Sequence, residues 1–353
     1  MRISSGLAVS RIIIALLIVA ILVVAVLTLA LYSRGKNNPS PSLHSLDHTY
    51  FAYLLKNPTE ESPVGIASYG ISNNSGTLHF YRIDASEVEG IADVSAINAV
   101  TNWNYSIYPQ YGILSCITCA SLQMNVNAVV NTTSGQQIFW IQNTVSFFDT
   151  STDSFLPAHG QIWNLTTIDA NMSTGISGNG ELGELDNQTD YGFGSFFAPT
   201  MSYNLPLSVK LVTSVQMIQN GVQIRLYDSP FGNGTFSPYG VAYMPIGNAL
   251  SASIVVTPFV TYPWGYPNGL RPTFDSELVW TAYCCAQTTK FTEMDSSLSL
   301  SYLNSASGGF VPYPSYYTFG DVIETASNLR VVPIQTGGEV TIGQNNNSFL
   351  SSS

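Results

Sequence analysis

The chain has 353 residues, of which 9% are charged and 45% are hydrophobic. So little charge with so much apolar sequence excludes disorder for most of the chain. Only 11 Lys and Arg stand against 22 Asp and Glu, so no basic stripe is available for phosphates, which excludes nucleic acid as a partner. Few ion pairs also leave little stability for acid to remove, so the composition is compatible with low pH.

The N-terminus carries a long apolar run. Residues 12–32 form 21 consecutive residues without charge, flanked by Arg2, Arg11, Arg34 and Lys36. About 20 apolar residues span a bilayer as a helix, and the apolar core of a cleaved signal peptide is shorter. We therefore expect a signal anchor or transmembrane helix within residues 1–36, with a cleaved signal peptide as the alternative.

Residues 37–62 are rich in Ser, Pro and Asn and predict a stalk. Sequons for N-glycosylation recur, although Asn, Ser and Thr are frequent enough that several arise by chance. They lie at Asn73, Asn104, Asn131, Asn164, Asn171, Asn187, Asn233 and Asn346. With the apolar run, they favour a glycoprotein at the cell surface, anchored through residues 12–32, or secreted if the segment is cleaved.

From residue 63 onward the pattern is that of β-strands. In SLQMNVNAVV, residues 121–130, Leu, Met, Val and Ala alternate with Gln and Asn, and NTTSGQQ then predicts a turn into IFWIQNTVSFF. Asn220-Gly221 lies between two further β-patterned runs, which is a strong hairpin signal. Further strands are predicted in LSASIVVTPFV and SSLSLSYL. The sequence predicts an all-β fold of sandwich- or barrel-like lobes behind an N-terminal transmembrane helix.

Three segments refine this organisation. SEVEGIADVSAINAV, residues 86–100, is the one stretch with a helix-like pattern, which Gly90 weakens. A Ser-, Gly- and Asn-rich region around residues 171–200 predicts a boundary between a first β lobe, 63–200, and a second, 201–334. Residues 335–353 end in GQNNNSFLSSS and predict a disordered tail.

The chain has four cysteines: Cys116, Cys119, Cys284 and Cys285. Outside the cell disulfides are the expected state, and links between the two pairs would tie distant segments together. Free thiols and a metal site are the alternatives, and connectivity does not follow from sequence. The four histidines lack ligand spacing, so no metal and no cofactor are predicted.

Familiar catalytic signatures are missing, including nucleophile elbows, zinc motifs and phosphate loops. Two carboxylate clusters remain: Asp275 with Glu277, and Asp321 with Glu324. Residues i and i+2 of a strand share a face, and residues i and i+3 of a helix are neighbours. The alternatives are structural: Asp275 capping a turn, Glu277 accepting from a backbone donor or pairing with Arg271, and Asp321 forming an Asx-turn.

Six strings in order resemble the thermopsin family of acid endopeptidases: PVGIASYGI, SLQMNVNAV, FWIQNTVSFF, QIWNLT, FDSELVW and YYTFGDVIETASNL. The resemblance implies a surface-bound or secreted peptidase that cleaves peptide or protein substrates in acid without metal. It places Asp275 and Glu277 on the D-x-E-L-V carboxylates of the family, and Glu324 on its late Glu. We expect a catalytic pair with one member from each cluster.

Three departures from the family pattern bear on activity. Ser68 stands where relatives commonly carry Asp, and Gly160 and Gln161 precede Ile162 where relatives carry Asp before N-I-W-N. The glycine-rich segment after E-L-V is replaced by WTAYCCAQTT. The alternative is therefore a catalytically inactive cell-surface β protein that binds envelope proteins or glycans. A glycosidase with paired carboxylates is a more distant alternative.

Overall fold

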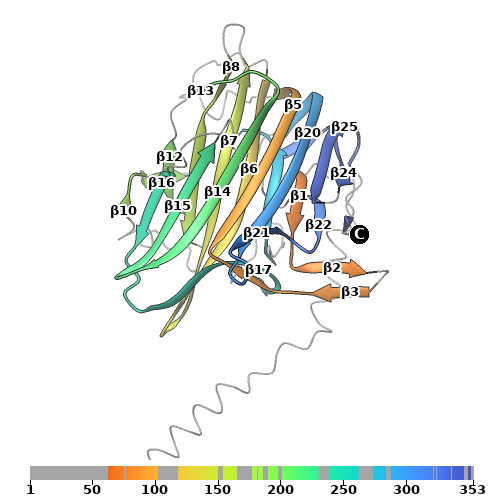
Figure 1. Ribbon diagram of the computed structural model, residues 1–353. Helices are drawn as coiled ribbons and strands as arrows, with labels where there is room; N and C mark the ends of the chain where they lie inside the picture. The colour runs from red at the N-terminus through yellow and green to blue at the C-terminus, as the bar shows by residue number, and fades with distance from the viewer. Residues whose placement is uncertain are drawn as a thin grey trace, which may run out of the picture. The chain divides into compact units, whose positions relative to one another are not determined.

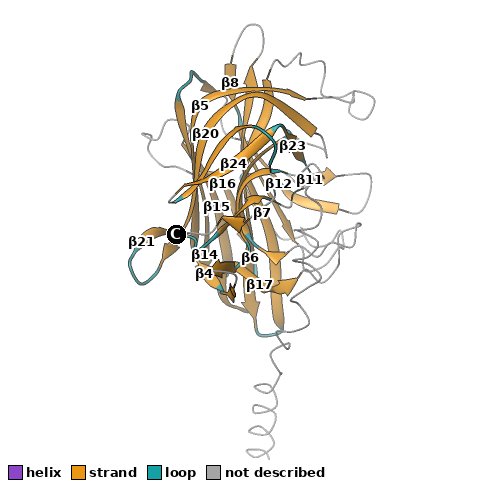
Figure 2. Cartoon of the chain, turned by 90° about the vertical axis from the view of Figure 1, so that its right-hand side faces the viewer, coloured by secondary structure: helices purple, strands orange, loops and turns teal. Residues whose placement is uncertain are grey.

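The computed structural model consists of β-strands throughout its described part. It describes residues 63–74, 77–101, 118–149, 154–164, 177–180, 182–185, 190–197, 201–229, 238–261, 273–283, 288–320, 322, 324–334, 336–345 and 349–350. Within these residues the strands form a 14-stranded sheet, called the first sheet, a 10-stranded sheet, called the second sheet, and a two-stranded ribbon (Figure 1). The prediction of an all-β fold is confirmed, and strands dominate the view in Figure 2 as well.

The first sheet runs in the order β11 (Leu182–Leu185), β12 (Asp190–Phe197), β9 (Ala158–Asn164), β7 (Gly135–Asp149), β6 (Thr118–Thr132), β19 (Ser276–Thr281), β1 (Val64–Ser68), β22 (Tyr316–Phe319) and β26 (Phe349–Leu350). Five further strands belong to this sheet but lie off this path: β4 (Ile83–Ala85), β8 (Ser154–Leu156), β13 (Met201–Ser202), β17 (Ala249–Thr261) and β18 (Thr273–Phe274).

The second sheet runs in the order β10 (Ser177–Gly178), β16 (Pro238–Met244), β15 (Gly221–Ser229), β14 (Leu207–Ile218), β5 (Glu87–Thr101), β20 (Thr288–Asn304), β25 (Gly337–Ile342) and β24 (Leu329–Ile334). Two short strands, β21 (Gly309–Pro312) and β23 (Thr325–Ser327), pair with β20. The ribbon joins β2 (Ile71–Asn74) to β3 (Thr77–Phe80).

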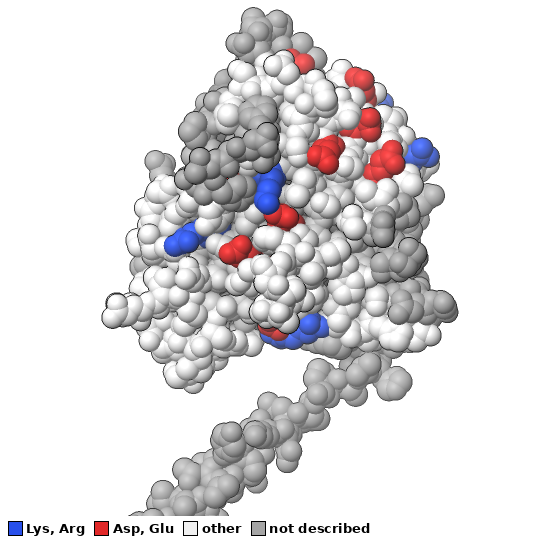
Figure 3. Space-filling view, in the orientation of Figure 1, with Lys and Arg blue, Asp and Glu red and all other residues white. Residues whose placement is uncertain are grey.

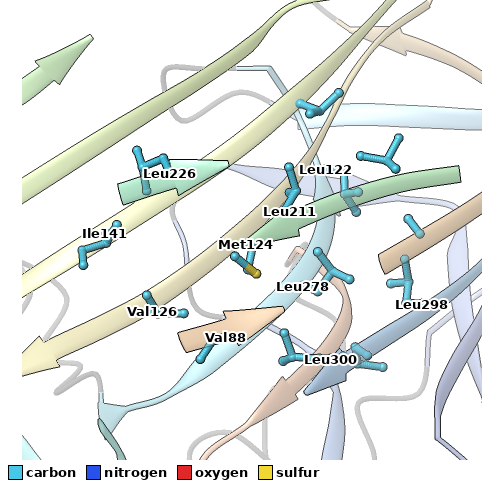
Figure 4. Packing of buried hydrophobic residues seen from close by; sticks show 14 of the residues in the cluster. Val88, Leu122, Met124, Val126, Ile141, Leu211, Leu226, Leu278, Leu298 and Leu300 are labelled. Carbon is cyan, nitrogen blue, oxygen red and sulfur yellow. The ribbon is translucent and has the colours of Figure 1, made fainter. Parts of the chain in front are cut away.

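The larger of two hydrophobic clusters in the described residues lies between the two sheets. Leu122, Met124 and Val126 of β6 belong to the same buried cluster as Val88 of β5 and Leu211 of β14 (Figure 4). Because strand residues alternate in direction, the other residues of β6 point away from the second sheet. We call this opposite side the outer face of the first sheet.

Two predicted hairpins are confirmed. β6 and β7 pair from Thr132 opposite Gly135, with a two-residue turn at Thr133 and Ser134. β14 and β15 pair from Ile218 opposite Gly221, so the turn residues are Gln219 and Asn220. The β patterns predicted in SLQMNVNAVV, LSASIVVTPFV and SSLSLSYL lie in β6, β17 and β20.

The prediction of a helix in residues 86–100 was wrong, because this segment forms strand β5. Val94 and Ile97 are both buried although they are three residues apart. A bulge at Ser95, where the pairing with β20 shifts register, moves the alternation by one residue and imitates helical spacing. Gly90 has a packing reason: a Cβ there would lie 3.0 Å from Leu278 Cδ1, so the glycine allows the sheets to approach.

The predicted tail also needs correction, because residues 337–342 form β25 between β20 and β24, with Val340 fully buried. The sheets do not follow the predicted lobe boundary near residue 200 either: each contains strands from both halves, and residues 53–353 form one compact unit. The described part of the chain holds no helix capable of crossing a membrane. The predicted membrane segment 12–32 and the stalk 37–62 lie outside the described residues.

Candidate active site

Along the middle of β6, the outer face of the first sheet is polar yet buried. Gln123, Asn125 and Asn127 alternate with the core residues of β6, as the sequence predicts, but each is at most 1% exposed. Alternating polar residues on a sandwich strand ordinarily face water. Removing amide groups from water costs free energy unless they are hydrogen-bonded, so we expect these amides to have hydrogen-bond partners within the protein.

Those partners include the two carboxylates of the first predicted cluster. Asn125 Nδ2 donates a hydrogen bond to Glu277 Oε1 over 2.6 Å, and Asn127 Nδ2 donates to Asp275 Oδ1 over 3.0 Å. Glu277 is 0% exposed and Asp275 is 3% exposed. Asn125 and Asn127 lie two residues apart on one face of β6, so both carboxylates lie on the outer face, as predicted for an i, i+2 pair.

Strand register places Glu277 in a polar row across the sheet. Gln161 of β9 pairs with Gln142 of β7, which pairs with Asn125 of β6, which pairs with Glu277 of β19. Beyond Glu277 the row continues through Ala67 of β1, which is also fully buried. The carboxylate is thus positioned by central strands, which hold a side chain more firmly than loops do.

The chain after β22 passes directly against the Glu277 carboxyl group. A Cβ on Gly320 would lie 2.8 Å from Glu277 Cδ and 3.0 Å from Val279 Cγ1, and it would collide with Glu277 Oε2. The Gly320 N–H donates to the carbonyl of Pro63 over 3.1 Å, which fixes this approach. Any side chain at residue 320 would require the Glu277 carboxyl group to shift.

Gly320 immediately precedes Asp321, the first residue of the second predicted cluster. Asp321 itself lies outside the described residues. Glu324 is partly buried and directly precedes β23, which pairs in parallel with β20 of the second sheet. Arg271, a predicted alternative partner of Glu277, also lies outside the described residues.

Ser68, where relatives commonly carry Asp, lies on the core side of β1. It pairs with Ser276, whereas its neighbour Ala67 pairs with Glu277. Its Oγ is 2.7 Å from the Tyr81 hydroxyl, which is 3.2 Å from Ser315 Oγ. Burial raises the pKa of Tyr81, although these hydrogen bonds lower it. Residue 68 therefore belongs to a separate hydroxyl cluster on the opposite side of the strand from Glu277.

Gly160, the second departure, also faces the core. It pairs with Asn143, and a Cβ there would collide with Leu226 of the second sheet and lie 3.1 Å from the Tyr239 hydroxyl. That hydroxyl donates to Asn143 Oδ1 over 2.7 Å, and burial raises the pKa of Tyr239 well above its ordinary value. A side chain at residue 160 would require Leu226 to shift, and it would not share a face with Glu277.

The third departure begins at Trp280. Its side chain is fully buried on the core side of β19, with its ring centroid 5.1 Å from that of Phe147. Thr281 points to the outer face and Tyr283 follows. The ring of His159 on β9 lies 6.1 Å from that of Tyr283, and burial lowers the pKa of His159 to about 4.

Cys119 is disulfide-bonded. Cys116, Cys284 and Cys285 lie outside the described residues, so the predicted linkage of the two pairs stays a prediction. Among the residues that the structure describes, no three His, Cys, Asp or Glu side chains form a group suited to a metal ion.

Sequence reasoning missed the roles of Asn125, Asn127 and Gly320. The two amides were assigned correctly to the side of β6 opposite the core, but nothing in the alternation indicated that they hold the carboxylates. The sequence interpretation assigned no role to the glycine before Asp321. A signal existed for both: polar residues that are amides instead of charges, and a glycine beside a candidate acid.

Comparison with known proteins agrees with the six strings quoted above. The family model described as Thermopsin matches residues 47–329. Thermopsin from Sulfolobus acidocaldarius is 28% identical over 305 residues, covering 82% of this chain and 84% of the relative. The matched range includes the core strands of both sheets, Asp275, Glu277 and Gly320. The chain therefore belongs to the thermopsin family of peptidases.

Proposed function

We propose that the protein is an acid endopeptidase that hydrolyses peptide bonds with Glu277 and Asp321 as its catalytic pair. The observation that carries this assignment is the contact between the Glu277 carboxyl group and Gly320, the residue that leads into Asp321. Family membership supports peptides or proteins as substrates. The pair combines one member of each predicted cluster.

Two carboxyl groups held close together do not both ionise readily, so they share one proton in acid. A hydrogen-bond donor stabilises the ionised form of a carboxyl group. Because Asn125 Nδ2 lies 2.6 Å from Glu277 Oε1, we assign Glu277 the ionised role and Asp321 the protonated one. Asp275 has its own amide partner, Asn127, and we assign it a structural role beside the pair.

The reaction then follows from these two states. Glu277 removes a proton from a water molecule as the water oxygen attacks the carbonyl carbon of the scissile bond. Asp321 donates its proton to the carbonyl oxygen, which stabilises the tetrahedral intermediate. When the C–N bond breaks, Glu277 passes the proton it took to the leaving nitrogen, and Asp321 recovers its own proton from the collapsing hydroxyl group.

The departures at Ser68 and Gly160 do not weaken this proposal, because both residues lie on the core side of their strands. An Asp at either position would be separated from Glu277 by the sheet itself. They therefore give no specific support to the inactive alternative, which remains open to direct test.

The test is cleavage of an unfolded protein by the full-length chain in detergent at about pH 2–4, where a carboxylate pair holds one proton. Glu277→Gln and Asp321→Asn should each lower kcat by about 100-fold or more, the scale of general acid–base catalysis. Gln can still accept from Asn125, so folding should survive; thermal unfolding checks this. Asp295→Asn, an exposed acid on β20, is the matched control and should retain activity.

Two outcomes would change the proposal. Full activity of either Glu277→Gln or Asp321→Asn would overturn this pair, and the same assay on Glu324→Gln and Asp275→Asn would then identify a replacement. A folded wild-type chain that cleaves nothing across the acidic range would favour the alternative, a surface β protein that binds envelope proteins or glycans.

A further inference from the structure

Four buried oxygen atoms on the outer face of the first sheet have no hydrogen-bond partner among the groups described: Asn125 Oδ1, Thr144 Oγ1, Ser146 Oγ and Thr281 Oγ1. About 90% or more of buried polar groups in proteins are paired, so a cluster of exceptions asks for an explanation. Each is also within two strands of Glu277, which links the cluster to the proposed active site.

Register shows how these oxygens are arranged. Ser121 of β6 pairs with Ser146 of β7 on one side and with Thr281 of β19 on the other. Neighbouring strands are about 4.8 Å apart, so the two unpaired hydroxyls flank Ser121 at roughly 10 Å from each other. Thr144 lies two residues from Ser146 and shares its face. The Ser121 row lies four residues from the Asn125 row, or roughly 13 Å along the strand.

The polar groups between these oxygens are satisfied. Gln142 Nε2 donates to Gln123 Oε1 over 2.9 Å, and Gln123 Nε2 donates to Ser121 Oγ over 3.2 Å. Ser121 Oγ in turn donates to the carbonyl of Ala282 over 2.6 Å. The face is therefore an ordered network, and the unpaired hydroxyls at its margins are not a sign of loose packing.

We propose that Thr144, Ser146 and Thr281 bind the main chain of the peptide substrate on one side of the scissile bond. This inference rests on the proposed function. A hydroxyl group both donates and accepts, so it can pair with a peptide C=O or N–H whatever the side chain beside it. An extended peptide rises about 3.3 Å per residue, so roughly four residues reach from the Glu277 row to the Ser121 row.

The three side chains are uncharged, and Thr144, Ser146 and Thr281 are each 0% exposed. A peptide reaches them only when this face is accessible. An unfolded, extended substrate can do so more readily than a folded domain, because its backbone groups are not already paired. The site thus selects for extended main chain and is indifferent to charge.

The test exploits a separation between stability and activity. Thr144→Val, Ser146→Ala and Thr281→Val remove only the hydroxyl oxygen. Because that oxygen makes no hydrogen bond in the free protein, each change should leave the melting temperature equal or higher. A lost hydrogen bond to substrate should lower kcat/KM by roughly 3- to 10-fold for each hydroxyl, mainly through KM. The triple variant should lose roughly 100-fold.

Ser296→Ala provides the matched control. Ser296 is a buried hydroxyl on β20 that also has no partner among the described groups, but it belongs to the second sheet. Its removal should shift stability in the same direction and leave kcat/KM unchanged. If removing any unpaired buried hydroxyl lowered activity, Ser296→Ala would lower kcat/KM as much as the variants of the first sheet do.

Substrate length sharpens the test further. A peptide is shortened one residue at a time from each end, and kcat/KM of the wild type and the triple variant are compared. The difference should vanish once the peptide no longer reaches the hydroxyls, on one end only. Wild-type kcat/KM in the triple variant on the longest peptide would overturn the inference if Glu277→Gln is inactive. If Glu277→Gln is also fully active, the proposed catalytic pair has failed instead.

Discussion

The outer faces of the two sheets carry similar rows of polar residues, which are exposed on the second sheet and buried on the first. On the second sheet, Glu339, Ser297 and Asp93 lie side by side across β25, β20 and β5, and both acids are exposed. Figure 3 shows acidic side chains gathered in this region of the surface. On the first sheet, Asn125 and Glu277 lie in an equivalent row and are buried. Alternation along a strand thus fixes which face a side chain occupies, but not whether water reaches it.

The difference has an energetic meaning. Exposed carboxylates on a sheet surface are solvated and contribute little to stability. A buried carboxylate costs free energy unless it is paired, and removing its partners costs more still. A chain with only 9% charged residues that nevertheless buries Asp275 and Glu277 together keeps them at a cost, which is typical of a functional site.

The largest effect on the buried row is expected from Gly320→Ala. The added Cβ would collide with the Glu277 carboxyl group, so the site must shift or open. We expect a loss of about 1–3 kcal/mol of unfolding free energy, the usual cost of overpacking, and a fall of at least about 10-fold in peptidase activity. Chemical denaturation and the cleavage assay measure the two effects.

Gly309→Ala is the control for this substitution. A Cβ on Gly309, in β21 of the second sheet, meets nothing within 4 Å. It should change the unfolding free energy by no more than a few tenths of a kcal/mol and leave the peptidase activity unchanged. Equal behaviour of the two alanine variants would contradict the close approach of Gly320 to Glu277.

Most of the strand pattern was predictable because alternation and turn chemistry are local. The β6–β7 and β14–β15 hairpins follow from short polar turns between β-patterned runs. β5 was not, because the bulge at Ser95 changes the period without leaving a local mark. β25 was not, because GGEVTI is too short and glycine-rich to indicate a strand until its neighbours β20 and β24 supply the pairing.

The candidate site divides in the same way. The shared face of Asp275 and Glu277 followed from strand periodicity, which needs only sequence spacing. The contact of Gly320 with Glu277 joins residues 43 positions apart through β1, whose pairing with both β19 and β22 has no signature in either segment. The burial of Asn125 depends on what packs over the face, which no single strand encodes.

A smaller expected effect is a pH dependence of stability that arises from His159. Burial lowers the pKa of His159, on the outer face of the first sheet, to about 4 from an ordinary 6.5. Between these pH values His159 is protonated in the unfolded chain but neutral in the folded chain. The unfolding free energy therefore falls as the pH falls from 6.5 to 4, and then levels off. His159→Gln should remove this loss, worth roughly 1–2 kcal/mol for a partly buried side chain.

Denaturant unfolding of the wild type and His159→Gln at a series of pH values measures this difference. His79→Gln, at an exposed histidine on β3, is the control. Parallel curves for wild type and His159→Gln between pH 4 and 6.5 would show that His159 is solvated in the folded protein, and the outer face would then be more open than its burial indicates.

The smallest expected effect is on the exposed row. Glu339 and Asp93 flank Ser297 from adjacent strands, so their carboxylates lie roughly 10 Å apart, close to the screening length of physiological salt. Glu339→Gln should therefore stabilise the protein at pH 7 by no more than about 0.5 kcal/mol at low salt. That gain should disappear at roughly 1 M salt, where the screening length falls to about 3 Å, and activity should not change. Denaturant unfolding at both salt concentrations measures it. A loss above about 1 kcal/mol would mean that this row, like the row of Glu277, is covered and paired, and the contrast between the two faces would fail.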